Sequence, residues 1–472
     1  MRDSISFYLN GFKKEVRGAE AFLTLSSFLR YNCGLTGTKV VCAEGDCGAC
    51  TIMSSKWRPQ KTEASAYQSI NSCIAMTFAM DGANLVSVEG MTAKNEDLSE
   101  VQCSMVRNFG GQCGFCTPGF VMSIANMHEH KTKPTEQNAK NYLTGNLCRC
   151  TGYSPILKAA LDVDIKKHVY LKDKFPPKAF TEQMQESILI SAGDLEFFAP
   201  TTVAEATNYK NQHSEVIIFS GSTDLGVQFN KGHLEPKKIL SLHLIAELYD
   251  HRIENNEVSI GSRVTLSEMQ TLIEDKIPSL NHFLNIFASP QIKNAGTVIG
   301  NLANGSPIAD LTPVLMALDT EIELASPNVR RTINLSDFYL GYKKLNLQKD
   351  EIVTRIRFRV PDQKQKIENY KISQRRDLDI STVNASFNFT MNGSKIEKAR
   401  MAYGGVAATT LRLSEIETRI EGKELNKNSV AEIKNWITDS IKPLSDSRGT
   451  AEFRKILAGN LFEKFTDEHF SL

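Results

Sequence analysis

The chain has 472 residues, 41% hydrophobic and 23% charged, which suffices for about three domains that each bury a core. Its 55 Lys and Arg residues balance 54 Asp and Glu residues at a net charge of +1, which excludes the strong basic field of many nucleic-acid-binding proteins. No apolar run approaches the roughly 20 residues that span a bilayer, and the opening M-R-D-S-I-S-F lacks the apolar run of a signal peptide. We therefore expect a cytoplasmic, multidomain α+β protein.

The first predicted elements are a hairpin and a short helix. Apolar and polar residues alternate from Ile5 to Leu9, and Asn10-Gly11 then predicts the tight turn of a β-hairpin. Thr24 is a possible N-cap of a helix that Gly34 ends. Further strands are expected at Thr51–Met53, Cys73–Phe78 and Leu85–Val88.

Four cysteines lie within and after a loop of this region. The loop reads C-A-E-G-D-C-G-A-C, which is C-x4-C-x2-C, and the fourth cysteine follows 23 positions later. This is the plant-type spacing for a [2Fe–2S] cluster, and the two glycines of the loop permit backbone conformations that a Cβ would forbid. The predicted ligands are Cys42, Cys47, Cys50 and Cys73. Residues 1–91 are therefore predicted to form a plant-type ferredoxin domain with a β-grasp fold.

Residues 92–165 change to a helical pattern with sharp stops. Helices are expected at Val101–Phe109, at Phe120–His128, from Thr135 to Gly145, and from Ser154-Pro155 onward. Two close pairs of cysteines stand just before helices, where the positive end of the helix dipole favours anionic thiolates. The predicted ligands of this second cluster are Cys113, Cys116, Cys148 and Cys150. We expect a four-helix [2Fe–2S] domain.

Two other interpretations of the cysteines stay open. Zinc also accepts four thiolates and often uses C-x2-C, although its usual spacings do not include C-x4-C-x2-C with a distant fourth ligand. A disulfide framework would need an oxidising compartment. The two remaining cysteines, Cys33 and Cys103, suit a buried structural role, and the nine histidines are interpreted as structural or surface residues.

The middle of the chain carries two stretches of small residues. Residues 166–192 are predicted to be a linker, and a new domain begins at residue 193. The apolar run Val216–Phe219 predicts a strand buried on both faces, and it leads into Ser220–Gly226. A second small-residue stretch covers Gly296–Asp310. Such stretches let backbone N–H groups approach phosphate, so two of them suggest the two phosphates of a dinucleotide.

The last region, residues 363–472, is predicted to be a separate α+β domain that closes over the cofactor. It contains Gln374-Arg375-Arg376-Asp377 and a strand-like stretch at Thr382–Thr390. Helical segments are expected near 414–421, 429–440 and 446–465.

Several of these motifs together resemble one known family. G-Q-C-G-F-C-T-P-G at Gly111–Gly119 and G-N-L-C-R-C-T-G-Y at Gly145–Tyr153 look like iron–sulfur segments of the xanthine dehydrogenase family of molybdenum hydroxylases. G-S-T-D-L-G at Gly221–Gly226 and G-N-L-A-N-G-S-P-I-A-D at Gly300–Asp310 look like its flavin segments. The resemblance covers nearly the whole chain and is nearest to the iron–sulfur/FAD small subunit of two-gene bacterial xanthine dehydrogenases.

The resemblance implies FAD in a two-part α+β domain at residues 193–362. The implied FAD contacts are Ile218, Phe219, Ser220, Gly221, Ser222, Thr223, Asp224, Leu225, Phe287, Thr297, Val298, Ile299, Gly300, Asn301, Asp310, Val353 and Lys371. The chain departs from the family where Asp377-Leu378-Asp379 replaces a longer acidic stretch, which puts the electron acceptor in doubt.

The resemblance also implies a function. A purine such as hypoxanthine or xanthine would be oxidised at molybdopterin on a larger partner subunit, in a heterodimer or a dimer of heterodimers. Electrons would pass to the cluster of Cys113, Cys116, Cys148 and Cys150, then to the other cluster, then to FAD and NAD+. No residue of this chain is expected to be catalytic. The edge that carries Gln112 and Arg149 would face the pterin of the partner.

Other functions stay open. The chain could be a stand-alone iron–sulfur flavoprotein that acts as an electron carrier or NADH diaphorase. It could also be the same subunit in a hydroxylase of another N-heterocycle or of an aldehyde. A zinc scaffold with a degenerate flavin fold is disfavoured, because both small-residue loops are intact.

Overall fold

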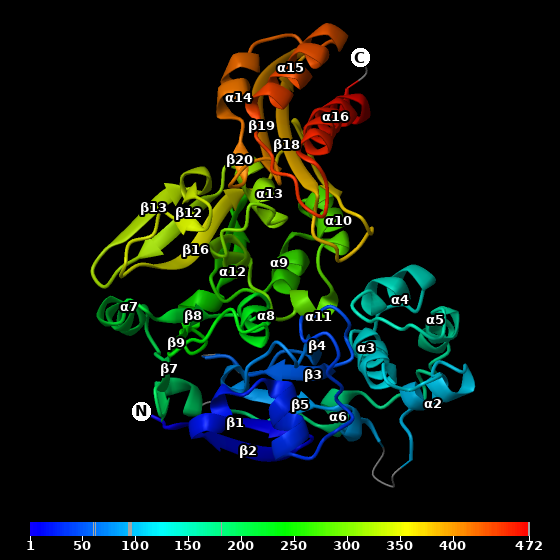
Figure 1. Ribbon diagram of the computed structural model, residues 1–472. Helices are drawn as coiled ribbons and strands as arrows, with labels where there is room; N and C mark the ends of the chain where they lie inside the picture. Colours follow the sequence, from blue (N-terminus) through cyan, green and yellow to red (C-terminus); the bar gives the residue numbers. More distant parts are fainter. Residues whose placement is uncertain (60, 62, 93–96, 181, 471–472) are drawn as a thin grey trace. The chain divides into compact units, whose positions relative to one another are not determined.

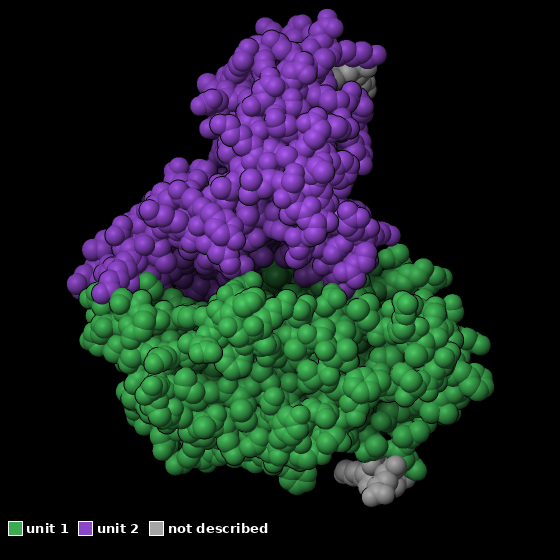
Figure 2. All heavy atoms as spheres, viewed as in Figure 1, with its two compact units in different colours: residues 1–247, 265–267, 289–296 green, residues 248–264, 268–288, 297–472 purple. Residues whose placement is uncertain are grey.

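The computed structural model describes residues 1–59, 61, 63–92, 97–180 and 182–470. The predicted domain and linker ranges include residues 60, 62, 93–96, 181 and 471–472, which lie outside the described residues. Contacts divide the chain into two compact units, coloured separately in Figure 2. Unit 1 comprises residues 1–247, 265–267 and 289–296, and unit 2 comprises residues 248–264, 268–288 and 297–472. Both units mix helices and strands, as the sequence predicts.

Unit 1 begins with a five-stranded sheet in the order β2-β1-β5-β3-β4, in which β1 and β5 are parallel. Its strands are β1 (Ser4–Leu9), β2 (Phe12–Arg17), β3 (Thr51–Lys56), β4 (Gln68–Asn71) and β5 (Ala83–Val86). The predicted hairpin is confirmed, and Asn10 and Gly11 have the positive φ values of 50° and 86° that its tight turn requires. Short helices α1 (Leu25–Ser27) and η2 (Phe28–Asn32) follow the cap Thr24, whose hydroxyl accepts from the Ser27 N–H.

The strand predicted at Cys73–Phe78 is wrong. Strand β4 lies earlier in the chain, and Thr77–Met80 form the 3-10 turn η3. The N–H of Leu25 donates to the Ala75 carbonyl at 2.8 Å, and the N–H of Ser26 donates to the Ser72 carbonyl at 3.0 Å. These carbonyls satisfy N–H groups at the start of α1 that have no partner inside the helix.

The four predicted helices of the second region are confirmed (Figure 1). They are α2 (Glu100–Arg107), α3 (Thr117–Glu129), α4 (Glu136–Leu143) and α5 (Ser154–Leu161). Thr135 caps α4 as expected, by accepting from the Asn138 N–H at 3.2 Å. Helix α3 begins three residues before the predicted start, because its first turn accommodates Pro118.

The rest of unit 1 contains a four-stranded sheet in the order β6-β7-β9-β8. Its elements are α6 (Leu171–Lys174), β6 (Ile188–Ala192), β7 (Leu195–Ala199), α7 (Val203–Gln212), β8 (Ile217–Phe219), α8 (Leu225–Asn230), β9 (Lys238–Ser241) and α11 (Pro290–Lys293). The stretch predicted as a linker thus contains β6. Strand β8 is not buried on both faces, because it lies at the edge of the sheet and Ile217 and Ile218 are half-buried.

The two sheets of unit 1 share one core. The ring of Phe78 stacks on Phe197 with a centroid distance of 4.7 Å, and it meets Phe219 edge-on at 5.5 Å. All three rings are buried. Aromatic pairs at these distances contribute about 0.5–1.5 kcal/mol beyond their buried area, so the strand that leads into the first small-residue loop is anchored on the β-grasp domain.

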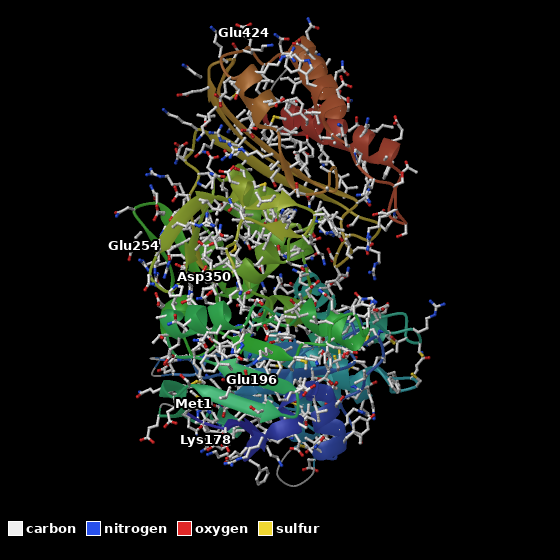
Figure 3. All side chains as sticks on the ribbon, turned by 60° about the vertical axis from the view of Figure 1, so that its left-hand side comes forward. Met1, Lys178, Glu196, Glu254, Asp350 and Glu424 are labelled. Atoms are coloured by element: carbon white, nitrogen blue, oxygen red, sulfur yellow. The ribbon has the colours of Figure 1, made fainter. Side chains whose placement is uncertain are left out.

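Unit 2 contains an antiparallel sheet in the order β10-β11-β16-β12-β13 and a second sheet in the order β17-β18-β19-β20. The first comprises β10 (His251–Glu254), β11 (Glu257–Gly261), β12 (Glu321–Ala325), β13 (Arg330–Asn334) and β16 (Ile352–Arg359), and a small hairpin pairs β14 (Tyr339–Gly341) with β15 (Lys344–Leu345). Helices nearby are α9 (Leu266–Ile273), which begins in unit 1, α10 (Pro278–Ile286), α12 (Val298–Ala303) and α13 (Leu311–Ala317). Glu254, at the end of β10, is exposed, as is Glu424 in the C-terminal part of the chain (Figure 3).

The second sheet of unit 2 packs against three helices. It comprises β17 (Gln365–Ile372), β18 (Val383–Asn392), β19 (Lys395–Gly404) and β20 (Leu411–Arg412), followed by α14 (Ser414–Ile420), α15 (Lys427–Ser440) and α16 (Ala451–His469). The predicted strand and three helices are confirmed, although α16 begins five residues after the predicted start. Its core gathers Phe387, Phe389, Phe462 and Phe465.

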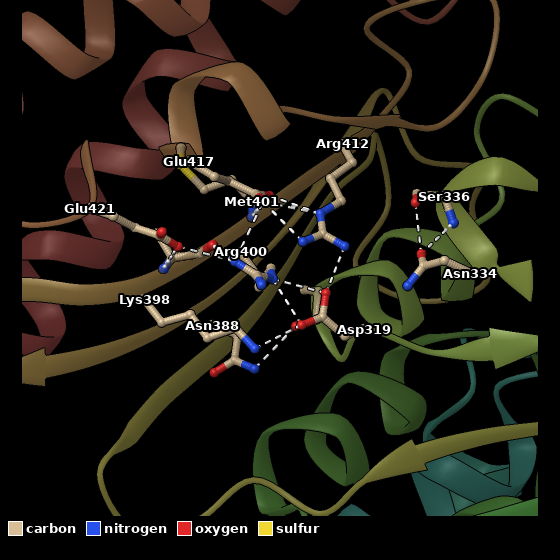
Figure 4. A network of polar contacts seen from close by, with 12 residues as sticks. Asp319, Asn334, Ser336, Asn388, Lys398, Arg400, Met401, Arg412, Glu417 and Glu421 are labelled. Atoms are coloured by element: carbon tan, nitrogen blue, oxygen red, sulfur yellow. Dashed lines mark hydrogen bonds and ion pairs between the residues drawn. The ribbon is translucent and has the colours of Figure 1, made fainter. Parts of the chain in front are cut away.

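A charged network joins the end of α13 to this sheet (Figure 4). Asp319, with φ of 51°, accepts hydrogen bonds from Lys398 and Arg400 at 2.9 Å and pairs with Arg412 at 2.7 Å. Burial raises the pKa of the Asp319 carboxyl, but these three cations outweigh it and hold the pKa below its ordinary value. The network therefore holds α13, the helix that follows Asp310, against the C-terminal sheet.

Candidate cluster and flavin sites

Most cysteines of the first set lie in the loop between η2 and β3. Cys42, Cys47 and Cys50 lie in this loop and Cys73 follows β4; all are buried except the half-buried Cys42. The loop turns through left-handed residues at Gly45 and Gly48, with φ values of 75° and 65°. A Cβ at Gly48 would lie 2.3 Å from the Gly145 carbonyl oxygen, so this position requires glycine.

The four thiols of this set interact with one another. Hydrogen bonds from the Cys47 and Cys73 thiols hold the pKa of Cys42 far below its ordinary value, while the pKa of Cys73 is raised by Cys42 and Cys50. The N–H groups of Glu44 and Cys47 approach the Cys42 sulfur at 3.4 and 3.5 Å. Sulfur that accepts backbone N–H groups is stabilised as thiolate, which is the form that binds iron.

The second set lies at the N-terminus of α3 and in the loop before α5. The sulfurs of the exposed Cys113 and Cys150 are 3.7 Å apart. Burial, together with a hydrogen bond to Cys148, raises the pKa of Cys116 to about 12. Burial opposes ionisation of Cys148, but hydrogen bonds from the Thr151 side chain and N–H lower its pKa.

In both sets the thiols therefore interact with one another, which the four thiolate ligands of one [2Fe–2S] cluster would also have to do. Among the described residues, no three His, Cys, Asp or Glu side chains meet in an arrangement for a single metal ion. Cys33 and Cys103, expected to be buried, are half-buried.

The loops of the two sets are in direct contact. The Leu147 N–H donates to the Cys47 carbonyl at 3.0 Å, and the Asn146 side chain donates to the Gly48 carbonyl at 3.1 Å. Since Leu147 precedes Cys148, one hydrogen bond and a short run of covalent bonds connect a ligand of one set to a ligand of the other.

The first candidate flavin loop, Ile218–Leu225, lies in unit 1. A Cβ at Gly221 would lie 2.2 Å from the Ala295 carbonyl oxygen. Ser222 has a positive φ of 60°, and its buried hydroxyl has no hydrogen-bond partner within the protein. A strained loop with an unsatisfied buried hydroxyl fits a site for a polar ligand such as pyrophosphate.

The second candidate loop, Thr297–Asn301, lies in unit 2 at the start of α12. The Thr297 hydroxyl caps this helix by accepting from the Gly300 N–H at 3.0 Å, and a Cβ at Gly300 would crowd that hydroxyl at 2.6 Å. The side-chain oxygen of Asn301 is buried without a partner within the protein. Because the two loops belong to different units, their joint binding of one dinucleotide stays a prediction.

The other predicted FAD residues also lie in unit 2, and two of them are in contact. Asp310 pairs with Lys371 on β17, and it also accepts from Ser381 and Asn384. Sequence reasoning missed Ser381 and Asn384, which are separated from Asp310 by 71 and 74 residues. Val353 is buried in β16, and the half-buried Phe287 stacks on Phe283 with centroids 6.3 Å apart.

The acidic stretch Asp377-Leu378-Asp379 is held by hydrogen bonds to Lys371 and Arg375. Leu378 has a positive φ of 66°, the carbonyl of Asp379 accepts from Lys371 at 2.6 Å, and its carboxylate accepts from the Arg375 N–H at 3.1 Å. The Asp379 carboxylate is therefore engaged by its own loop.

Three family profiles match consecutive parts of the chain. They are described as [2Fe-2S] binding domain, over residues 87–161, FAD binding domain in molybdopterin dehydrogenase, over residues 193–362, and CO dehydrogenase flavoprotein C-terminal domain, over residues 368–469. These regions define an oxidoreductase component with iron–sulfur and flavin-binding domains. The chain belongs to the molybdenum hydroxylase family and resembles its small iron–sulfur/FAD subunit.

Relatives of known name agree with this assignment. Xanthine dehydrogenase 1 of Arabidopsis thaliana is 28% identical over 97% of this chain and 39% of its own length. Xanthine dehydrogenase of Emericella nidulans is 30% identical over 98% of this chain and 38% of its own length. The chain thus spans about two fifths of these curated relatives.

A solved structure is also similar. Carbon monoxide dehydrogenase from Hydrogenophaga pseudoflava, in a form that lacks the Mo-pyranopterin moiety of its molybdenum cofactor, matches with a TM-score of 0.55 and 25% identity. The match covers 57% of this chain and 95% of that chain. No helix among the described residues is long and apolar enough to cross a membrane.

Proposed function

We propose that the chain is the electron-transfer part of a molybdenum-containing xanthine dehydrogenase. It would bind two [2Fe–2S] clusters and one FAD, take up electrons from hypoxanthine or xanthine oxidised at a partner molybdopterin subunit, and pass them to NAD+. The observation that carries the proposal is the contact between the two cysteine loops, where the Leu147 N–H donates to the Cys47 carbonyl. This contact would bring the two four-cysteine sites close together, and electron transfer between clusters requires such closeness.

The thiols and the two small-residue loops fit these cofactors. When bound, the clusters would supply one-electron transfer and FAD would exchange one-electron for two-electron chemistry. The residues of this chain hold the sites: N–H groups stabilise the sulfurs of Cys42 and Cys148, and Gly221 permits close backbone packing beside the Ser222 hydroxyl.

The surface around the second cysteine set supports a partner. Large apolar side chains that lie close to Cys113 or Cys150 in the sequence are exposed, and exposed apolar groups of this kind are typical of interaction sites. They include Phe109, which is 81% exposed, Phe115, Leu147 and Tyr153. Gln112 and Arg149 lie on the same loops and are exposed. We assign this face to the molybdopterin subunit.

The proposal is tested by purifying the chain with its natural partner and following the visible absorption of the clusters. Xanthine should bleach the complex but not the chain alone. Gln112→Ala or Arg149→Ala should slow xanthine-driven reduction about tenfold, in the range for residues that support a redox site, while NADH-driven reduction stays unchanged.

Gln137→Ala, an exposed change on α4 away from both cysteine loops, is the matched control and should alter neither rate. Full reduction of the chain alone by xanthine would refute the division of labour. Purification without any molybdenum-containing partner, together with rapid NADH oxidation, would favour a stand-alone diaphorase instead.

A further inference from the structure

Gln291, on helix α11, is buried between the two cysteine loops of unit 1. Its side chain is 1% exposed and its amide nitrogen lies within hydrogen-bond distance of three oxygens from different elements. These are Thr51 Oγ1 at 3.3 Å, Ser123 Oγ at 3.1 Å and Asn146 Oδ1 at 2.9 Å. The residue is separated from Thr51 by 240 positions and from Asn146 by 145.

The three acceptors are tied to the cysteine loops. Thr51 directly follows Cys50, and its hydroxyl donates to the Gly48 carbonyl at 2.6 Å. Asn146 lies two residues before Cys148, and its amide donates to the same Gly48 carbonyl at 3.1 Å. The Ser123 hydroxyl on α3 donates to Asn146 Oδ1 at 2.6 Å. All are 3% exposed or less.

The closest packing of this region is built around Gln291. A Cβ at Gly145 would lie 2.3 Å from its side-chain oxygen, and a Cβ at Gly119, on α3, would lie 2.2 Å from the Gly48 carbonyl oxygen. Glycine at these positions therefore lets the loop, α3 and α11 approach one another. A buried polar network of this kind specifies one arrangement, because displacing any member leaves others without partners.

We propose that Gln291 is a positioning residue that fixes the spacing of the two cluster-binding loops, and with it the electronic coupling between the clusters. The inference rests on the proposed function, since it requires two clusters. Gln291 acts through its hydrogen bonds to Thr51, Ser123 and Asn146. Thr51 and Asn146 in turn donate to the Gly48 carbonyl and hold it against the segment before Cys148.

The test compares Gln291→Met, which keeps length and volume but removes the amide, with Asn126→Leu. Asn126 is also buried and accepts from the Ser69 N–H at 3.1 Å, so it too joins α3 to the β-grasp sheet, but through β4 and not through a cysteine loop. Both variants should lower the midpoint of thermal unfolding. Only Gln291→Met should alter the magnetic splitting between the two reduced clusters in low-temperature EPR spectra.

Gln291→Met should also slow cluster-to-cluster electron transfer about tenfold, at the lower end of the range for outer-shell partners. Thr51→Val removes one hydrogen-bond acceptor of Gln291 without changing the size of the side chain. It should change the EPR splitting and the electron-transfer rate in the same direction as Gln291→Met does. This second variant keeps the test decisive if Gln291→Met loses iron. The reductant is dithionite, so neither substrate, partner nor NAD+ enters the measurement.

Unchanged splitting and rate in Gln291→Met, with two intact clusters, would overturn this inference alone. Equal changes in Asn126→Leu would likewise overturn it, because they would reflect general loosening. A chain that contains no pair of clusters would overturn the proposed function as well.

Discussion

The Nζ atom of Lys371 lies 2.7 Å from Oδ2 of Asp310, and the two side chains are only 1% and 8% exposed. A buried ion pair of this kind is costly to break, because the remaining partner keeps its charge away from water. Asp310 ends the second small-residue stretch and precedes α13, whereas Lys371 lies on β17. The pair therefore joins the start of α13 to the C-terminal sheet within unit 2.

Lys371→Met should therefore lower the free energy of unfolding by about 3 kcal/mol, the lower end of the range for removing one partner of a buried ion pair. The lower end is expected because Ser381 and Asn384 still donate to Asp310. Flavin content should fall with it. Urea unfolding and the flavin released on heating measure the two effects. Lys366→Met, at an exposed position of the same strand, serves as control. Equal stability of both variants would contradict this account of the pair.

The eight paired cysteines predict about four iron and four labile sulfide per chain and two distinct EPR signals on reduction. Cys47→Ser should abolish one signal and Cys148→Ser the other. Cys33→Ser and Cys103→Ser should leave the iron content unchanged, since these thiols are outside both sets. Stoichiometric zinc in place of iron would disprove the assignment.

Gly221→Asp should expel FAD, because any side chain at this position meets the Ala295 carbonyl and a carboxylate also repels phosphate. Gly300→Asp should do the same at the second loop. Gly341→Ala, where a Cβ meets no atom within 4 Å, is the control and should retain flavin. Flavin released from the wild-type chain should be FAD; release of FMN would refute the two-phosphate interpretation.

Burial lowers the pKa of His128, a residue of α3 whose ring nitrogen lies 3.1 Å from the carbonyl of Ala160 on α5. The unfolded chain then binds a proton at higher pH than the native chain does. The stabilisation by neutral His128 is complete above the ordinary pKa of 6.5 and is lost as the pH falls through the lower native value.

Urea unfolding at about pH 7.5 and about pH 5.5 should show a smaller difference for His128→Gln than for the wild type. His282→Gln, at an exposed position, should retain the full difference. A wild-type difference that persists in His128→Gln would assign the acid sensitivity to other groups.

Local signals in the sequence predict much of this fold. Asn10-Gly11 predicts the hairpin, Thr24 and Thr135 predict helix starts, and the cysteine spacing predicts which thiols meet. Local signals do not predict the parts of the structure that depend on contacts between residues far apart in the sequence. The segment from Cys73 has strand-like residues, but its carbonyls are used by the start of α1. Gln291, Ser381 and Asn384 could not be found, because a single buried polar side chain carries no pattern that reveals a partner 71 to 240 residues away.

The path of the chain through the two units has a consequence for biosynthesis. Unit 1 takes its last segment from residues 289–296, after the chain has already contributed residues 248–264 and 268–288 to unit 2. Domains usually fold in order as they leave the ribosome. Here unit 1 is complete in sequence only after Gln291 has emerged, by which time part of unit 2 is already outside. Any metal delivered to the cysteines before that moment meets loops that do not yet have the hydrogen bonds of Gln291 to Thr51 and Asn146.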